Sequence, residues 1–185
     1  EDLPVSSVVA INGFALGGGL ELTMAGSLRV MSSAAKVGVP EVKLGLFPGF
    51  GGTVRLSRLA GPAVACDWVG GGQPQAADTA LAVGVVNEVV APETVRAAAL
   101  ALLRRAMVGE VDWSGQQRCK REPVPMTAAE RALVFEAALV KVAPLIARQQ
   151  PAAHRAIQMM AEAAGCDRAS ALALEAKEFG EVART

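Results

Sequence analysis

The feature that most constrains the fold is a short apolar run that ends at glycines and passes directly into a helical pattern. Residues 5–11 are rich in β-branched side chains and predict a buried strand. A glycine triplet at 17–19 follows, and residues 20–25 predict a helix that begins at the last of these glycines. Two further runs, 28–31 and 36–39, predict strands. Strands that alternate with helices indicate an α/β fold.

The same alternation continues to residue 107, where the pattern changes. We predict these elements from periodicity and end residues: helices over 53–59, 62–69, 75–82 and 92–107, and a strand over 85–90. Residues 108–126 are polar and contain two prolines, which predicts a loop or linker, with 112–120 a solvated charged segment. Residues 127–185 are expected to be wholly helical, and Thr127 with Glu130 fits a capping box.

Composition excludes several classes of function. Eighteen basic residues balance eighteen acidic ones, so nothing favours nucleic acid as a partner. No apolar run is long enough for a membrane helix. Three dispersed cysteines and one histidine exclude a Cys/His zinc site, so we expect no bound metal, reduced cysteines and a cytoplasmic protein. Chemistry must therefore come mostly from carboxylates, amides or a bound cofactor.

Two carboxylates, Glu21 and Glu41, are the only ones between Leu3 and Ala60. Glu21 falls in the first turn of the helix after the glycine triplet, where unpaired amides and the helix dipole favour a developing negative charge. Glu41 follows Pro40, which fixes the local backbone. Two carboxylates facing one pocket could divide the acid and base roles in handling a water molecule. Alternatively, Glu21 is only a favourable dipole partner and the triplet only a tight turn.

Other features favour structural roles. The glycines lack the lysine of a phosphate loop and the third glycine of a dinucleotide fingerprint. The triplet at 70–72 is expected to form a flexible loop. His154, Trp68 and Trp113 are interpreted as packing or surface residues.

Three motifs, in this order and spacing, resemble the crotonase (enoyl-CoA hydratase/isomerase) superfamily. They are INGFALGGGLEL at 11–22, VPEVKLG at 39–45 and PGFGGTVRL at 48–56. The segments 111–123 and 171–179 are similar to the linker and following helix of multifunctional fatty-acid β-oxidation α-subunits. The resemblance thus covers nearly the whole chain.

The resemblance implies a crotonase-like ββα spiral core over 1–107, a linker over 108–126 and a helical region over 127–185. It further implies enoyl-CoA hydratase activity with Δ3-Δ2-enoyl-CoA isomerisation. Glu21 matches the base that activates water, Glu41 the acid that protonates the α-carbon, and Gly18 one oxyanion amide. The residues matched to substrate binding are Leu16, Gly17, Gly49 and Phe50. A coenzyme A thioester is then the substrate, no cofactor is bound covalently, and NAD belongs to a downstream hydroxyacyl-CoA dehydrogenase domain.

Two departures from the family accompany these expectations. Ala25-Gly26-Ser27 stands where the family usually has an aspartate, for which we expect a structural consequence. The family also has a long segment before the point where this sequence starts, so we expect the N-terminal part of the core, with the second oxyanion amide, to lie outside it. An alternative is therefore an inactive fragment or interaction module. Thioesterase, dehalogenase or decarboxylase chemistry is disfavoured by the paired glutamates. The expected assembly is a crotonase-type trimer or a complex with a thiolase β-subunit.

Overall fold

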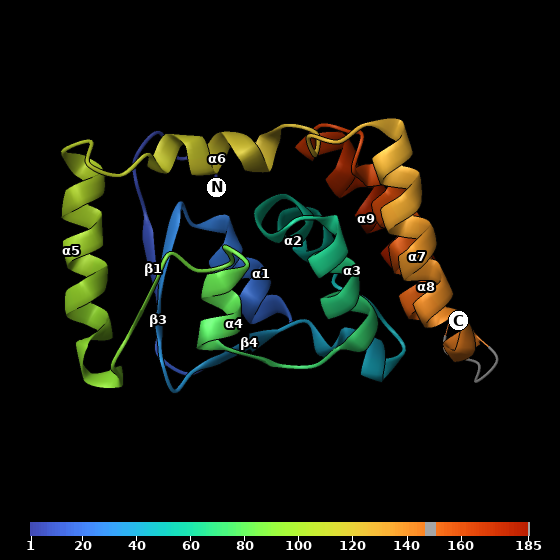
Figure 1. The fold of residues 1–185 in the computed structure, drawn as a ribbon, viewed down its shortest axis with the longest axis horizontal. Helices are drawn as coiled ribbons and strands as arrows, with labels where there is room; N and C mark the ends of the chain where they lie inside the picture. Colours follow the sequence, from blue (N-terminus) through green and yellow to red (C-terminus); the bar gives the residue numbers. More distant parts are fainter. Residues whose placement is uncertain (147–150, 185) are drawn as a thin grey trace.

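In the computed structural model, which describes residues 1–146 and 151–184, the first part of the chain winds between two small sheets (Figure 1). The first sheet is parallel, with the strand order β1 (Val8–Ile11), β3 (Leu28–Ser32), β6 (Glu88–Val90). The second has the order β2 (Phe14–Leu16), β4 (Lys36–Gly38), β5 (Gln75–Ala76), in which β5 is antiparallel to β4.

The chain passes from one sheet to the other through single turns. Strand β1 leads into β2 across Asn12-Gly13, helix α1 (Gly18–Ala25) follows, and β3 leads in the same way into β4. Val8 pairs with Leu28 in the first sheet, and Phe14 pairs with Lys36 in the second. Each passage of the chain through both sheets therefore adds one strand to each of them. The sequence did not predict β2, because a three-residue strand between glycines carries too little periodicity.

Helices enclose the sheets. They are η1 (Pro40–Leu44), α2 (Gly52–Ala60), α3 (Pro62–Gly71), α4 (Ala77–Ala82), η2 (Pro92–Thr94) and α5 (Val95–Met107). Helix α5 covers the outer face of the first sheet, where Leu28 and Val30 pack against Leu102 (Figure 1). Alternation along β3 turns Met31 toward the main core instead.

Two glycine-marked boundaries differ from the prediction. Gly70 and Gly71 form the last turn of α3, and Gly72 ends that helix in the left-handed conformation (φ 60°), so the triplet is not a flexible loop. Strand β6 is shorter than predicted, because the amides of Val85 and Val86 donate to the carbonyl of Ala80 at the end of α4.

The predicted loop at 108–126 contains a helix, α6 (Trp113–Arg121), and this expectation was wrong. Asp112 caps α6 by accepting a hydrogen bond from the amide of Gly115 at 2.8 Å. Lys120 is completely buried, and its Nζ donates to the carbonyls of Met24, Ala25 and Gly26 at 3.0, 3.1 and 2.9 Å. The segment is thus not a solvated loop, since its cation closes the carboxyl end of α1. Figure 1 shows α6 running from α5 toward α7–α9.

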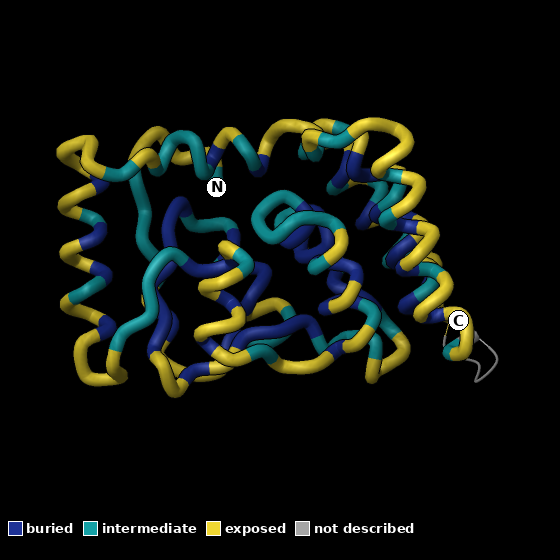
Figure 2. The backbone as a smooth tube through the Cα atoms, in the orientation of Figure 1, coloured by how far each residue is buried: buried dark blue, intermediate teal, exposed yellow. Residues whose placement is uncertain are grey.

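In the described part of the C-terminal region the chain is helical as predicted, with α7 (Ala128–Ile146), α8 (Ala152–Ala163) and α9 (Arg168–Val182), while 147–150 and 185 lie outside the described residues. The capping box is confirmed: the amide of Glu130 donates to Thr127 Oγ1 at 3.2 Å, and the amide of Thr127 donates to Glu130 Oε2 at 2.7 Å. These helices share one apolar core with the sheets, and their outward faces are exposed (Figure 2). Within the described ranges, no helix is long and apolar enough to cross a membrane.

Candidate active site

The site is built around the first turn of α1. Gly17 precedes this helix with φ 55°, and its amide donates to the carbonyl of Gly38 at 2.8 Å. A Cβ on Gly17 would lie 2.9 Å from Glu41 Oε1, so a side chain here would displace the carboxylate of Glu41. Gly18 is the first residue of α1, so its amide has no carbonyl partner within the helix.

Glu21 lies in that first turn and is only 2% exposed. Its Oε1 accepts hydrogen bonds from the amides of Phe50 and Gly52, each at 2.8 Å. Burial raises the pKa of Glu21, while the two amides and the charge of Arg55 oppose the rise. Glu21 is therefore a carboxyl group held in a fixed position by the glycine-rich segment before α2.

Glu41 differs in its hydrogen bonding. It lies on η1 directly after Pro40, and its Oε2 is buried without a hydrogen-bond partner in the described part of the chain. Burial, together with the negative charges of Glu21 and Glu175, raises its pKa to about 7. A carboxyl group with such a pKa can hold and release a proton near neutral pH.

A cavity of about 340 Å³ opens beside α1. Its lining residues are Gly18, Glu21, Leu22, Ala25, Phe50 and Arg55. Three of the predicted site residues thus meet at this cavity: Gly18, Glu21 and Phe50. Leu22 is 75% exposed and Phe50 79% exposed, which gives the cavity an apolar rim.

Four predicted site residues lie outside this lining: Leu16, Gly17, Glu41 and Gly49. Leu16 ends β2 and pairs with Gly38, and Gly17 lies against Glu41. Gly49 lies under the ring of Phe179, and a Cβ there would be 2.6 Å from Phe179 Cδ2. The missing side chain of Gly49 is therefore used for packing against α9.

Glu175 on α9 is a site residue that the sequence reasoning missed. It is 1% exposed, its Oε1 accepts from the amide of Gly51, and its Oε2 accepts from the amide of Thr53 at 3.1 Å and from the Thr53 hydroxyl. Burial raises its pKa, and these donors oppose the rise. One signal was available in the sequence, because Glu175 is a lone carboxylate on the helix face of Leu172 and Phe179.

Arg55 was also missed. It lines the cavity and forms an ion pair with Glu1 at 2.9 Å. Its place one turn into α2 follows from the third motif, but the sequence pattern alone does not distinguish it from a solvated surface arginine.

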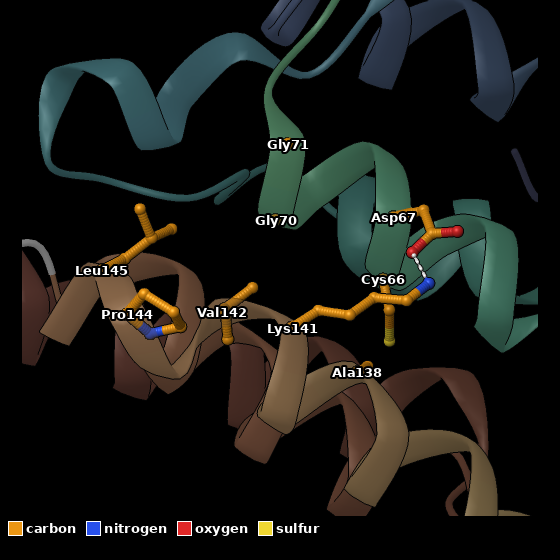
Figure 3. A pocket seen from close by; sticks show the side chains of 9 residues that line it. All are labelled: Cys66, Asp67, Gly70, Gly71, Ala138, Lys141, Val142, Pro144 and Leu145. Carbon is orange, nitrogen blue, oxygen red and sulfur yellow. Dashed lines mark hydrogen bonds and ion pairs between the residues drawn. The ribbon is translucent and has the colours of Figure 1, made fainter.

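A second cavity, of about 290 Å³, lies between α3 and α7 (Figure 3). Asp67 and Lys141 line it and form an exposed ion pair with each other at 2.8 Å. Burial raises the pKa of the neighbouring Cys66 thiol to about 12, so it is not a nucleophile at neutral pH. Across the described residues, no group of three or more His, Cys, Asp or Glu side chains could hold a metal ion.

Comparisons with known proteins identify the family and the fold. Residues 1–117 match the family model described as enoyl-CoA hydratase/isomerase. The chain is 49% identical over its whole length to the fatty acid oxidation complex subunit alpha of Pseudomonas aeruginosa (strain LESB58), and 48% identical to that of Pseudomonas entomophila. It spans about a quarter (26%) of the length of these curated relatives.

Solved structures support the fold. The crystal structure of an enoyl-CoA hydratase from Mycobacterium smegmatis matches 100% of this chain and 66% of its own, with a TM-score of 0.62 and 26% identity. Pseudomonas aeruginosa DspI matches 61% of this chain and 46% of its own, with a TM-score of 0.53 and 36% identity. The predicted crotonase-like α/β fold with a helical C-terminal region is thereby confirmed.

Proposed function

The chain belongs to the enoyl-CoA hydratase/isomerase family, and from this membership we propose that Glu21 and Glu41 add water to a trans-2-enoyl-CoA thioester. The observation that carries the proposal is the contrast between the two carboxyl groups. Glu21, in the first turn of α1, is held by the amides of Phe50 and Gly52, whereas Glu41 has a buried oxygen without a hydrogen-bond partner among the described residues. Such a contrast separates a base from an acid.

Glu21 is the base in this proposal. Both amides bond to Oε1, which leaves Oε2, on the side of Gly18, for a water molecule. As the water oxygen bonds to the β-carbon, one of its protons passes to Glu21. Positioned proton transfer of this kind contributes roughly 10²–10⁴-fold to the rate.

Glu41 is the acid, and it delivers its proton to the α-carbon as the oxygen adds to the β-carbon. The negative charge that develops on the thioester oxygen is stabilised by the amide of Gly18 and by the N-terminal end of α1. Loss of one such donor typically costs about 3 kcal/mol of transition-state stabilisation. Proton transfer from Glu21 back to Glu41 restores the starting state. In the isomerase reaction Glu41 moves the proton between carbons.

The substrate class also fits the cavity. Leu22 and Phe50 offer apolar surface to an acyl chain, and glycines allow the thioester to approach the backbone closely. We assign Leu16, Gly17 and Gly49 to the same substrate path, since they flank the start of α1 and the loop before α2.

The whole polypeptide is proposed to act in fatty-acid β-oxidation. In this proposal 1–107 form the hydratase core, and 127–185 lead toward a dehydrogenase domain that would bind NAD. The similarity to fatty acid oxidation complex alpha subunits supports this arrangement. A trimer or a thiolase β-subunit as partner, and a cytoplasmic location, belong to the same proposal.

Hydration of crotonyl-CoA tests the proposal, followed as loss of the conjugated thioester's absorbance by the whole polypeptide that carries these residues. We expect Glu41→Gln and Glu21→Gln to lower kcat by roughly 10²–10⁴-fold. Glu93→Gln, at an exposed glutamate on η2, serves as the control and should hydrate normally. Near-normal turnover in Glu41→Gln would refute the assignment. No turnover in a folded wild type would favour the inactive alternative.

A further inference from the structure

Four consecutive backbone amides before and within α2 are shared between two buried carboxylates. The amides of Phe50 and Gly52 donate to Glu21, and those of Gly51 and Thr53 donate to Glu175. Glu21 comes from α1 and Glu175 from α9, so the segment lies between two helices that are far apart in the sequence. The segment that fixes the proposed base is therefore itself fixed by a second glutamate.

The segment does not supply a side-chain cap for the helix that it leads into. Gly51 has φ 87°, a conformation open to glycine, and α2 begins there without a side-chain cap of its own. Glycines lose the most backbone entropy on ordering. Glu175 supplies the missing cap from α9, because it accepts from Thr53 at the second position of the helix and places a carboxylate at its positive end.

Packing on both sides of Glu175 holds α9 against the segment. A Cβ on Gly51 would lie 2.9 Å from Leu172 Cδ2, and one on Gly49 would lie 2.6 Å from Phe179 Cδ2. Leu172, Glu175 and Phe179 follow helical spacing on one face of α9. This face meets the segment at Gly49 and Gly51, so α9 cannot carry Glu175 away from the segment without breaking these contacts.

We propose that Glu175 is a positioning residue for Glu21, acting through the Phe50–Thr53 amides and not by touching substrate. The role rests on the proposed hydratase function. Without Glu175 the segment loses its second acceptor, and the two amides that orient Glu21 lose their fixed geometry. A misplacement of about 1 Å at a reacting group can cost up to about 100-fold in rate.

The charged groups that face this cluster are Glu21 from α1, Glu41 from η1 and Arg55 from α2. Glu175 adds negative charge beside Glu41 and so raises the pKa of that acid. Replacement of Glu175 by a neutral residue should therefore move the alkaline limb of the pH–rate profile to lower pH. A change in folding stability alone would not move that limb.

The test compares Glu175→Gln with Glu178→Gln, the same change on the same helix at a residue paired with Arg155. For Glu175→Gln we expect a 10–100-fold lower kcat for crotonyl-CoA, a KM within about twofold, and the shifted alkaline limb. Glu178→Gln should behave as wild type. Wild-type kcat and profile in Glu175→Gln, an effect on KM alone, or equal losses in both variants would each overturn the proposal.

Two further measurements test the proposal if Glu175→Gln does not fold or if the wild type has no hydratase activity. If Glu175→Gln does not fold, Thr53→Val, which removes only the hydroxyl donor, should lower kcat. Thr53→Ser, which keeps that donor, should have a higher kcat than Thr53→Val. Equal rates in these two variants would overturn the proposal.

If the wild type hydrates nothing, the proposed function fails, and hydrogen exchange still decides whether Glu175 holds the segment in position. Exchange at the amides of 50–53 should rise in Glu175→Gln but not in Glu178→Gln, and unchanged exchange would refute it.

Discussion

Gly49→Ala, combined with Phe179→Leu, measures how tightly α9 packs on the loop before α2. A Cβ on Gly49 would lie 2.6, 2.8 and 2.9 Å from three ring atoms of Phe179. Carbon atoms pack at about 3.5–4.0 Å, so the ring must move by roughly 1 Å. Overpacking of this kind costs about 1–3 kcal/mol. The ring also packs edge-on against Phe47, with centroids 5.9 Å apart, so its displacement weakens that contact as well.

Urea unfolding of the wild type, both single variants and the double variant gives the coupling between the two positions. Leucine lacks the ring atoms that the new methyl group meets, so the double variant should be more stable than the sum of the singles predicts, by about 1–2 kcal/mol. Gly71→Ala is the control, because a Cβ there meets nothing within 4 Å. Additive effects within about 0.5 kcal/mol would refute the reasoning, as would a Gly49→Ala variant no less stable than Gly71→Ala.

Two further predictions concern buried charge. Lys120→Met should lower the free energy of unfolding by about 2–5 kcal/mol, because the carbonyls of Met24 and Ala25 lose their donor; Lys43→Met, at an exposed lysine, should change it by less than about 0.5 kcal/mol in the same urea titration. Stability should also fall as pH rises from about 4.5 to 7, because folded Glu41 keeps a proton that the unfolded chain has lost. Glu41→Gln should reduce this slope, and an unchanged slope would contradict the assignment.

Local signals were sufficient for much of the fold. The run ending at Asn12-Gly13, the glycines before α1 and the Thr127–Glu130 capping box each depend on neighbouring residues, and the structure has them as predicted. The first-turn position of Glu21 follows from the same local pattern. Helix periodicity also identified the C-terminal helices, although their ends were not specified.

Long-range contacts account for what the sequence reasoning missed. The residues of α6 predict a polar loop, because its one buried cation, Lys120, donates to carbonyls that lie 94–96 residues away in the sequence. In the sequence Glu175 looks like an ordinary helical glutamate, because its role depends on the packing of α9 against the loop before α2. Neither partner can be inferred from the residues around it, because backbone amides and carbonyls are present at nearly every position.

The contact between Glu175 and Gly51 also has a consequence for the order of folding. The two residues are 124 positions apart, and closing so long a loop is slow compared with forming local structure. Synthesis runs from the N-terminus, so both sheets and α1 leave the ribosome well before Glu175 does. On a ribosome-bound nascent chain stalled before residue 175, the amides of Gly51 and Thr53 should exchange rapidly with solvent. The appearance of their protection would mark the moment at which α9 docks.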